Sequence, residues 1–223
     1  MSAKISVIIP AYNAANYLTG AVQSVTSQLA ADEREIIVVD DGSADNTPEI
    51  ARGLECMFFS QPHQGAATAR NCGIRHAAGD YILFLDADDV LRPGAIDALK
   101  TPFISQLALG AVFAKAQDFI SPELTAQEAK GLQLRPTPYE GVLPGCSLIT
   151  RETFEKVGLF DTTLNSAETV DWMMRLRELN IPCAKIDFVT LDRRLHLTNT
   201  GRLQSHQEMK NYAILLRKRI KRT

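Results

Sequence analysis

The sequence has no long apolar run, few cysteines and almost no excess of either charge, and each of these absences excludes a class of protein. No apolar stretch reaches the roughly 18–20 residues that a membrane-spanning helix needs. The 223 residues carry a formal net charge of -2, which excludes a domain built as a whole to hold nucleic acid but leaves local charged patches open. The apolar run near the start is too short for a secretory signal, so we expect none.

The four cysteines argue against a disulfide frame or a zinc site. Cys56, Cys72, Cys146 and Cys183 lie far apart, form no C-x-x-C pair and stand in apolar or tight-turn contexts. We therefore expect reduced, buried thiols in a cytoplasmic protein. What the sequence does contain is 45% hydrophobic residues, the share of an ordinary globular core, in a length that fits one large domain.

Strand and helix signals alternate through the first hundred residues. The β-branched run at 5–10 suits a strand buried on both faces, and apolar residues recur at helical spacing over 14–29. Further strands are predicted at 35–39, 57–60 and 80–85, with helices from Thr47 and over 66–77. This alternation predicts an α/β fold with parallel strands joined by right-handed crossovers.

The second half is less regular. Residues 119–139 are polar, carry three prolines and show only a weak helical stretch at 122–131, so we interpret them as a surface flap. Around the flap we expect helices over 93–99, 152–157 and 170–179, and strands over 111–116, 145–150 and 186–195.

Polar clusters follow three of the predicted strands. In open parallel sheets, ligands bind beyond the carboxyl ends of the strands. If the strands are neighbours, one edge of the sheet collects three segments: Pro10-Ala11-Tyr12-Asn13, Asp40-Asp41-Gly42-Ser43 and Asp86-Ala87-Asp88-Asp89.

The last of these clusters holds three carboxylates within four residues. Burying them without compensation would be costly, and a divalent cation relieves the repulsion. Mg²⁺ or Mn²⁺ suits a few carboxylates together with phosphate oxygens. The alternative is a turn in which one Asp caps the next helix, which explains one carboxylate but not three.

The other segments have simpler alternatives. The segment from Asp40 to Ser43 has the composition of a tight turn, although a carboxylate there could accept a hydrogen bond from a base or a ribose. Gly65 precedes a predicted helix of small residues that would allow a close backbone approach, with Arg70 and Asn71 one turn later. A lone glycine before a helix is usually only a cap, so this segment gains weight from its neighbours.

Taken together, the segments resemble a known family. Four of them are similar, in order and spacing, to the four successive motifs of family 2 glycosyltransferases of the GT-A fold: V-I-I-P-A-Y-N (7–13), V-V-D-D-G-S-A-D-N-T (38–47), Q-G-A-A-T-A-R-N-C-G (64–73) and F-L-D-A-D-D (84–89). A fifth resembles the acceptor-side segment of that family: C-S-L-I-T-R-E-T-F-E-K-V-G-L-F-D (146–161). The resemblance implies a GT-A fold with a mostly parallel central sheet flanked by helices.

The resemblance also implies inverting transfer of a hexosyl group from a nucleotide-sugar, most often a UDP-sugar, with Mn²⁺ or Mg²⁺ stabilising the departing diphosphate. We expect one domain over 1–201, with a donor half at 1–100 and an acceptor half at 101–201 that includes the flap. Asp88 would ligate the metal and Asp86 would contact ribose or metal-bound water. The other motif positions assign Pro10, Tyr12 and Asn13 to the base pocket, Asp40 or Asp41 to base or ribose, and Arg70 and Asn71 to the vicinity of the donor.

An inverting enzyme also needs a general base for the acceptor hydroxyl. The family supplies it as the Asp of a Glu-Asp pair, but this sequence has Glu168 followed by Thr169. Thr cannot act as a base near neutral pH, so either Glu168 or Asp171 takes the role, or activity is reduced or lost. The alternative for both carboxylates is a helix N-terminus that attracts negative charge.

The segment Arg193-Arg194-Leu195-His196 with Asn199 resembles the R-x-H-x-x-N segment that closes many domains of this family. The resemblance implies that His196 completes the metal site and that Arg193 or Arg194 faces the diphosphate, although a lone histidine at a strand end is more often structural. His63, His76 and His206 receive no function. Trp172 suits either the core or stacking on an acceptor sugar.

Residues 202–223 form a basic tail with seven basic residues against one acidic residue. It is either a solvated terminal helix or a peripheral anchor to anionic lipid on the inner face of a membrane. The anchor would suit a lipid-linked acceptor in surface polysaccharide synthesis, and glycan or peptide acceptors are alternatives. A catalytically silent nucleotide-sugar-binding homologue is the first rival function. A phosphotransferase or nucleotidyltransferase is the second, disfavoured because there is no phosphate loop of the G-x-x-x-x-G-K-[ST] type.

Overall fold

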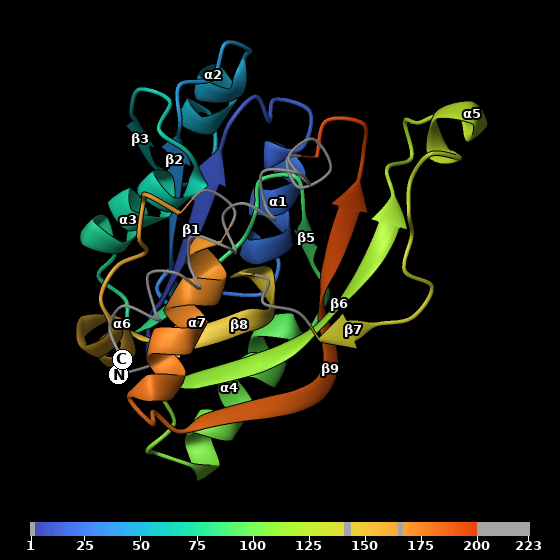
Figure 1. Ribbon diagram of the computed structural model, residues 1–223. Coiled ribbons are helices and arrows are strands. Elements are labelled where there is room, and N and C mark those ends of the chain that lie inside the picture. Colours follow the sequence, from blue (N-terminus) through green and yellow to red (C-terminus); the bar gives the residue numbers. More distant parts are fainter. Residues whose placement is uncertain (1–2, 141–143, 165–166, 200–223) are drawn as a thin grey trace.

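The computed structural model describes residues 3–140, 144–164 and 167–199. Helices flank a single sheet with the strand order β3-β2-β1-β4-β8-β6-β9-β5, to which β7 adds beside β6 (Figure 1). The predicted α/β class is therefore confirmed. The predicted basic tail lies outside the described residues.

The first half of the sheet is parallel, as predicted. β1 (Ile5–Ala11) pairs in parallel with β2 (Arg34–Asp40) and β4 (Tyr81–Phe84), and β2 pairs in parallel with β3 (Met57–Ser60). The register sets Ala11 opposite Asp40 and Asp40 opposite Ser60. The carboxyl ends of these strands therefore meet at one edge.

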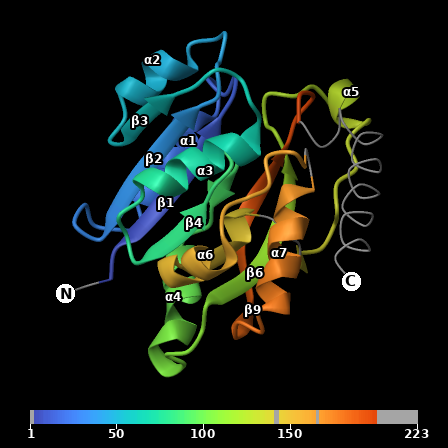
Figure 2. The same cartoon turned by 60° about the vertical axis from the view of Figure 1, so that its left-hand side comes forward.

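Alternate residues of β1 pack into two separate cores, because successive side chains of a strand point to opposite faces. Val7 and Ile9 pack with α1 (Leu18–Thr26), α2 (Thr47–Arg52) and α4 (Ala95–Ser105). Ile8 packs with α3 (Ala66–His76), α6 (Arg151–Val157) and α7 (Glu168–Glu178) (Figure 2). Burial on both faces explains why the strand reads as a continuous apolar run.

The second half of the sheet is mixed. β8 (Ser147–Thr150) runs antiparallel to both β4 and β6 (Ala111–Ile120), and β7 (Tyr139–Glu140) runs antiparallel to β6. β9 (Cys183–Leu195) is parallel to β6, with register shifts after Phe113 and Lys115. The expected mostly parallel pattern thus applies to β3-β2-β1-β4, and the whole sheet is mixed and curled.

A two-residue strand links the two halves at the site. β5 (Val90–Leu91) follows the carboxylate cluster directly and pairs antiparallel with β9, with Val90 opposite Asp192. This pairing carries the end of β9 to the loop between β4 and β5. Residues that lie more than a hundred positions apart in the sequence meet there.

The flap differs from its prediction. β6 continues to Ile120, and the weak helical stretch shortens to α5 (Ala126–Ala129), which Thr125 and Glu128 cap reciprocally. The arm projects from the sheet in Figure 1. Asp118 on β6 holds the segment that leads back from α5 to β7, because it accepts hydrogen bonds from the hydroxyl of Tyr139 at 2.6 Å and the backbone N–H of Arg135 at 3.2 Å.

Two further sequence predictions can be compared with the structure. All four cysteines are unpaired, but only Cys146 is fully buried and Cys183 is exposed, so the expectation of four buried thiols is wrong. The helix expected from residue 14 begins at Leu18, and in the turn before it the backbone N–H groups of Ala14 and Ala15 donate to Thr47 and Asp45. Across the described ranges, no helix has both the length and the apolar character that crossing a bilayer requires.

Candidate active site

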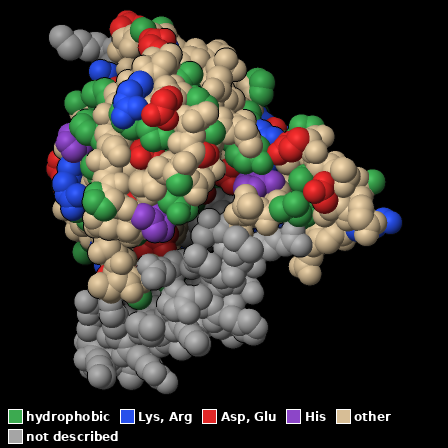
Figure 3. All heavy atoms as spheres, turned by 90° about the horizontal axis from the view of Figure 1, so that it is seen from above, with side chains coloured by type: hydrophobic (Ala, Val, Ile, Leu, Met, Phe, Trp, Pro, Cys, Tyr) green, Lys and Arg blue, Asp and Glu red, His purple; other side chains and the backbone are tan. Residues whose placement is uncertain are grey.

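Several of the predicted site residues lie at the carboxyl ends of neighbouring strands. Tyr12 and Asn13 follow β1, Asp40 closes β2, and the cluster from Asp86 to Asp89 follows β4. Figure 3 looks down on this edge and shows acidic and histidine side chains at its surface. The parallel register of three neighbouring strands is the physical reason that these loops converge.

Asp88 lies against the end of β9. Its Oδ2 is 2.9 Å from Nε2 of His196 and accepts a 3.2 Å hydrogen bond from the amide of Asn199. Asn199 in turn accepts a 2.6 Å hydrogen bond from the backbone N–H of His196, which fixes the turn after β9. The structure therefore brings together the two predicted metal ligands.

The donor set fits a divalent cation that also binds a substrate. Asp88 and His196 offer one carboxylate oxygen and one imidazole nitrogen at neighbouring positions. No group of three or more His, Cys, Asp and Glu side chains that could hold a metal occurs in the part of the chain that the structure describes. The remaining ligands would thus have to come from phosphate oxygens and water, which Mg²⁺ and Mn²⁺ accept.

Each of the three carboxylates has a partner within the protein. Asp86 pairs with Arg70 at 2.9 Å, and Asp88 contacts His196. Burial, followed by the charges of Asp88 and Asp86, raises the pKa of Asp89 well above its usual value, and Asp89 accepts a 2.8 Å hydrogen bond from the backbone N–H of Arg194. These partners offset part of the repulsion within the cluster, and the raised pKa of Asp89 shows that part of it remains.

Arg70 joins the loop after β4 to the start of α7. Its buried guanidinium donates from Nη2 to Asp86 and from Nη1 to Glu168, both at 2.9 Å. Burial lowers the pKa of Arg70, but the charges of the two carboxylates outweigh it and raise the pKa above its usual value. Nε of Arg70 and Oε2 of Glu168 are buried polar atoms without a hydrogen-bond partner among the described residues. A buried polar atom without a partner is costly, so these two atoms mark the place between α3 and α7 where hydrogen bonding is incomplete.

Asn71 is used inside the protein. Its side-chain amide donates to the backbone oxygen of Phe160 at 2.9 Å and accepts from the backbone N–H of the same residue at 3.0 Å. Both residues are buried. The amide therefore clamps the loop between α6 and α7 onto α3, a role that no sequence signal indicated.

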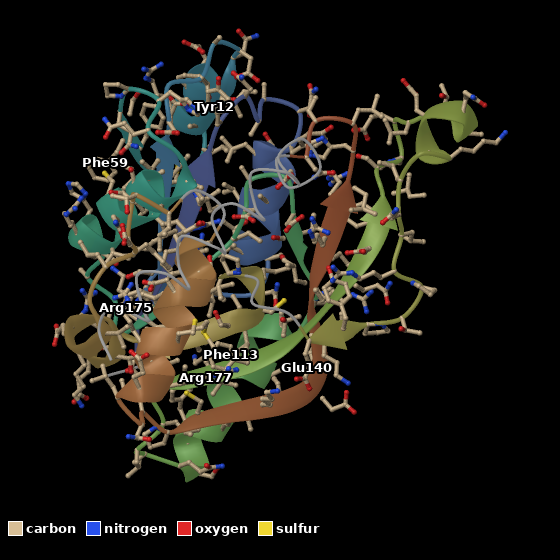
Figure 4. All side chains as sticks on the ribbon, viewed as in Figure 1. Tyr12, Phe59, Phe113, Glu140, Arg175 and Arg177 are labelled. Carbon is tan, nitrogen blue, oxygen red and sulfur yellow. The ribbon has the colours of Figure 1, made fainter. Side chains whose placement is uncertain are left out.

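Asp171 does not join the carboxylate cluster through its described contacts. It forms an ion pair with Arg175 at 2.8 Å, one helical turn later. Arg175 also donates to the carbonyl oxygens of Val157 and Leu159, at 2.6 Å and 2.8 Å, on the side of α7 that faces α6 (Figure 4). Trp172 is buried and donates to the carbonyl of Gly158 at 2.8 Å, so it belongs to the core.

Asp40 and Asp41 organise their own turns. Asp41 accepts hydrogen bonds from the backbone N–H groups of Gln64 and Gly65, at 2.9 Å and 2.8 Å, and from the amide of Gln61 at 2.7 Å. Asp40 accepts from the backbone N–H of Ser43 at 3.2 Å and the hydroxyl of Ser60 at 3.0 Å. The turn alternative is therefore realised, and Asp40 retains more accepting capacity than Asp41.

The predicted base pocket has one exposed aromatic ring. Tyr12 is half-exposed, and its ring stacks on that of His63 with 4.2 Å between centroids. Asn13 has a positive φ of 50° and accepts from the backbone N–H of Ala44 at 2.9 Å, which ties the first loop to the second. Pro10 remains within β1, opposite Val39. No sequence pattern pointed to His63.

Arg194 is engaged with the protein around the carboxylate cluster. Its Nε donates to the backbone oxygen of Asp88 at 2.8 Å, and its guanidinium lies between the rings of Tyr17 and Phe119, at 5.0 Å and 4.7 Å. Arg193 instead pairs with the buried Asp118 at 3.6 Å. Both guanidinium groups therefore already have partners within the protein, and neither is free for the predicted contact with a diphosphate.

Tyr17 is a further residue that the sequence did not indicate. Its ring lies 4.8 Å from that of His196, and its hydroxyl donates to Glu123 at 2.7 Å. Burial, together with the hydrogen bond to Glu123, raises the pKa of Tyr17 to about 12. Tyr17 thus links the base of the flap to the imidazole beside Asp88.

Comparison with known proteins gives a consistent result. The profile of glycosyl transferase family 2 matches residues 6–158. The chondroitin synthase of Pasteurella multocida is 26% identical over 228 residues, which cover 98% of this chain and 23% of that protein. The chain covers 12% to 60% of the lengths of this and the other curated relatives it matches.

Two solved structures share the fold. Residues 1–349 of TarS from S. aureus, in complex with UDP-GlcNAc, superpose with a TM-score of 0.71 at 23% identity, covering 88% of this chain and 60% of that one. The mannosyltransferase PcManGT from Pyrobaculum calidifontis, in complex with GDP-Man and Mn²⁺, gives a TM-score of 0.70 at 20% identity, covering 97% and 65%. At these identities the likeness concerns the fold, which is the GT-A fold.

Proposed function

The chain belongs to glycosyl transferase family 2, and we propose that it transfers a hexosyl group from a nucleotide-sugar, a UDP-sugar in the first instance, to an acceptor hydroxyl with inversion. The proposal rests on two sets of side-chain contacts at the carboxyl edge of the sheet. Asp88 lies beside His196, and Asp86 is joined through Arg70 to Glu168. A metal-bound diphosphate and a general base are what such a transfer requires.

Asp88 and His196 are the residues that would hold Mn²⁺ or Mg²⁺. When bound, the cation supplies charge stabilisation for the diphosphate that leaves. TarS and PcManGT, which share the fold, were solved with UDP-GlcNAc and with GDP-Man and Mn²⁺, respectively, and this supports the choice of donor class and of cation.

Glu168 is the better of the two candidate bases. It contacts Arg70, which also contacts Asp86, and its Oε2 has no partner among the described residues. Asp171 pairs with Arg175 on the α6 side of its helix. In the proposed step the acceptor proton passes to Oε2 of Glu168, the acceptor oxygen bonds to the anomeric carbon, and the bond from that carbon to the diphosphate breaks with its electron pair on the leaving oxygen. Arg70 holds the carboxylates of Glu168 and Asp86 in place.

A nucleotide-sugar-binding homologue without turnover is the second candidate. Thr169 stands where the family has its base, and one oxygen of Glu168 is engaged by Arg70 at 2.9 Å. This candidate requires binding of a nucleoside diphosphate and cation without transfer to any acceptor or to water.

The acceptor depends on the whole protein, and this chain covers only part of the length of its curated relatives. We propose a glycan acceptor, with lipid-linked and peptide-linked carriers to be tested against each other. In the lipid-linked case, the basic segment 202–223 would bring the domain to an anionic membrane surface.

Thermal unfolding with UDP, GDP and their hexose conjugates, each with and without Mn²⁺, tests the proposal. Stabilisation that needs both a nucleotide and the cation is expected, followed by donor hydrolysis or transfer. His196→Ala should remove the Mn²⁺-dependent part. Asp192→Asn is the control, because Asp192 also lies near the end of β9 but forms an ion pair with Arg92 and not with Asp88. If no nucleoside diphosphate stabilises the protein, the proposal fails; stabilisation without any turnover identifies the silent homologue.

A further inference from the structure

The ring of His63 has a defined position but no part in the chemistry described so far. Its Nδ1 lies 2.8 Å from Oδ2 and 3.1 Å from the backbone oxygen of Asp41. Both atoms are acceptors, so Nδ1 carries the hydrogen and the imidazole is tethered to the end of β2. The side chain is nevertheless 57% exposed.

The loop that carries His63 is equally fixed. The carboxylate of Asp41 also accepts hydrogen bonds from the backbone N–H groups of Gln64 and Gly65, the two residues that follow His63. Gly42 has a φ of +76°, and a Cβ there would come within 2.8 Å of the backbone N of His63. The backbones at Gly42 and His63 therefore pack closely, and this contact holds the loop that carries the imidazole against the end of β2.

The tethered ring supports Tyr12. The two ring planes are 27° apart with 4.2 Å between centroids, so His63 covers one face of Tyr12. Tyr12 remains 50% exposed at the carboxyl edge, beyond β1 (Figure 4). A half-exposed side chain normally loses rotamer freedom when a ligand orders it, and a stacked neighbour removes part of that cost in advance.

The position of the pair matches the base of a nucleoside diphosphate. β1 lies between β4, whose loop carries Asp88, and β2, which ends at Asp40. Tyr12 follows β1 and His63 is held at the end of β2, so one to two inter-strand spacings, about 5–10 Å, separate the pair from the loop of Asp88, a length comparable with the ribose and phosphate that join a base to a metal-bound phosphate. Every nucleobase has a flat π face that an aromatic ring can stack on.

We propose that His63 is a positioning residue of the donor site, which holds the Tyr12 ring from behind so that the nucleobase stacks on its open face. The proposal rests on the proposed function, because it presumes a nucleoside-diphosphate donor. His63 itself acts through Tyr12 and need not touch the ligand.

The test compares nucleotide binding with binding of the phosphate part alone. His63→Ala should weaken UDP binding in the presence of Mn²⁺ by about two- to tenfold, the range expected for one aromatic stacking contact, and leave binding of inorganic pyrophosphate unchanged. KM for the donor should rise by the same factor while kcat at saturating donor stays constant. His63→Phe keeps a ring behind Tyr12 but loses the hydrogen bond to Asp41, so it should restore only part of the affinity.

The chain offers a matched control. His76 also stacks on an aromatic ring, that of Phe59, with 3.9 Å between centroids, and its Nδ1 lies 2.9 Å from the backbone oxygen of Cys72. This pair involves the C-terminal end of α3 rather than the loop after β1. His76→Ala should therefore leave the UDP affinity unchanged, whatever it does to thermal stability.

A double-mutant cycle shows whether the effect passes through Tyr12. In a Tyr12→Ala background, His63→Ala should have no further effect on UDP binding. Additive losses, an equal loss for UDP and pyrophosphate, or an unchanged UDP affinity would overturn the role of His63. If the wild-type protein binds no nucleoside diphosphate, the proposed function fails and this inference with it, whereas a failure confined to the His63 variants leaves the proposed function standing.

Discussion

Glu168→Gln should lower turnover far more than Asp171→Asn, because the two carboxylates have different partners. Glu168 is 8% exposed, binds Arg70 and keeps an Oε2 without a partner among the described residues. A Gln amide still accepts the hydrogen bond from Arg70 but cannot take a proton from an acceptor. General-base catalysis contributes about 10²–10⁴ in rate, so kcat should fall by that factor, or about 3–5 kcal/mol in activation free energy.

The effects on folding should be small for both variants. With Glu168→Gln, Arg70 keeps Asp86 at 2.9 Å, so its charge is not left without a partner. The loss is the difference between a charge-assisted and a neutral hydrogen bond, about 1 kcal/mol. With Asp171→Asn, the amide oxygen can still accept from Arg175, which also keeps its two carbonyl contacts, so the loss is again the difference between a charge-assisted and a neutral hydrogen bond, about 1 kcal/mol.

The assay measures kcat, KM and the UDP dissociation constant for both variants, with thermal unfolding as the check on folding. The expected pattern is a large drop in kcat for Glu168→Gln with nearly unchanged UDP binding, and near wild-type kcat for Asp171→Asn. Wild-type turnover in Glu168→Gln would show that another group accepts the proton. An equal loss in the two variants would mean that disturbance of α7, rather than removal of a base, explains the effect.

Three other predictions concern the surroundings of the site. Asn71→Ala should lower the free energy of unfolding by about 2–4 kcal/mol in denaturant titrations, because it leaves both backbone groups of Phe160 buried without their partners, and UDP affinity should change little in the folded fraction. Hydrogen bonds from Ser121 and then Tyr17 lower the pKa of Glu123 to about 2, so its stabilising effect is present above the unfolded pKa near 4.3 and is lost as the pH falls through about 2. The Tm of Glu123→Gln should accordingly lie slightly below that of wild type at pH 7 and converge with it in acid; a constant difference would refute this. Arg194→Lys should raise the Mn²⁺ concentration needed for half-maximal nucleotide binding, because a lysine cannot stack between the two rings while donating to the Asp88 carbonyl, and unchanged Mn²⁺ dependence would contradict that role.

The first half of the fold was predictable because its signals are local. The strands predicted at 5–10, 35–39 and 57–60 correspond to β1, β2 and β3, and the helix at 66–77 corresponds to α3 within one residue. β1 and β2 are short apolar runs buried in the sheet, β3 is a partly exposed run at its edge, and α3 follows a glycine, and these patterns depend on neighbouring residues only. The flap was less predictable, because Asp118 fastens it from β6 through contacts made across about twenty positions.

The sequence by itself determined the family, the α/β class and the chemical type of the residues at the strand ends. Motif order and residue identity are linear properties, and they suffice for that. Only the tertiary structure decided which of those residues face one another: that Arg70 reaches Glu168, that Asn71 holds Phe160, that Asp171 is committed to Arg175 and that His63 lies behind Tyr12. The physical reason is that a carboxylate, amide or imidazole satisfies its hydrogen bonds with whatever partner packing brings within about 3 Å, and across β5, β9 and α7 that partner is remote in the chain.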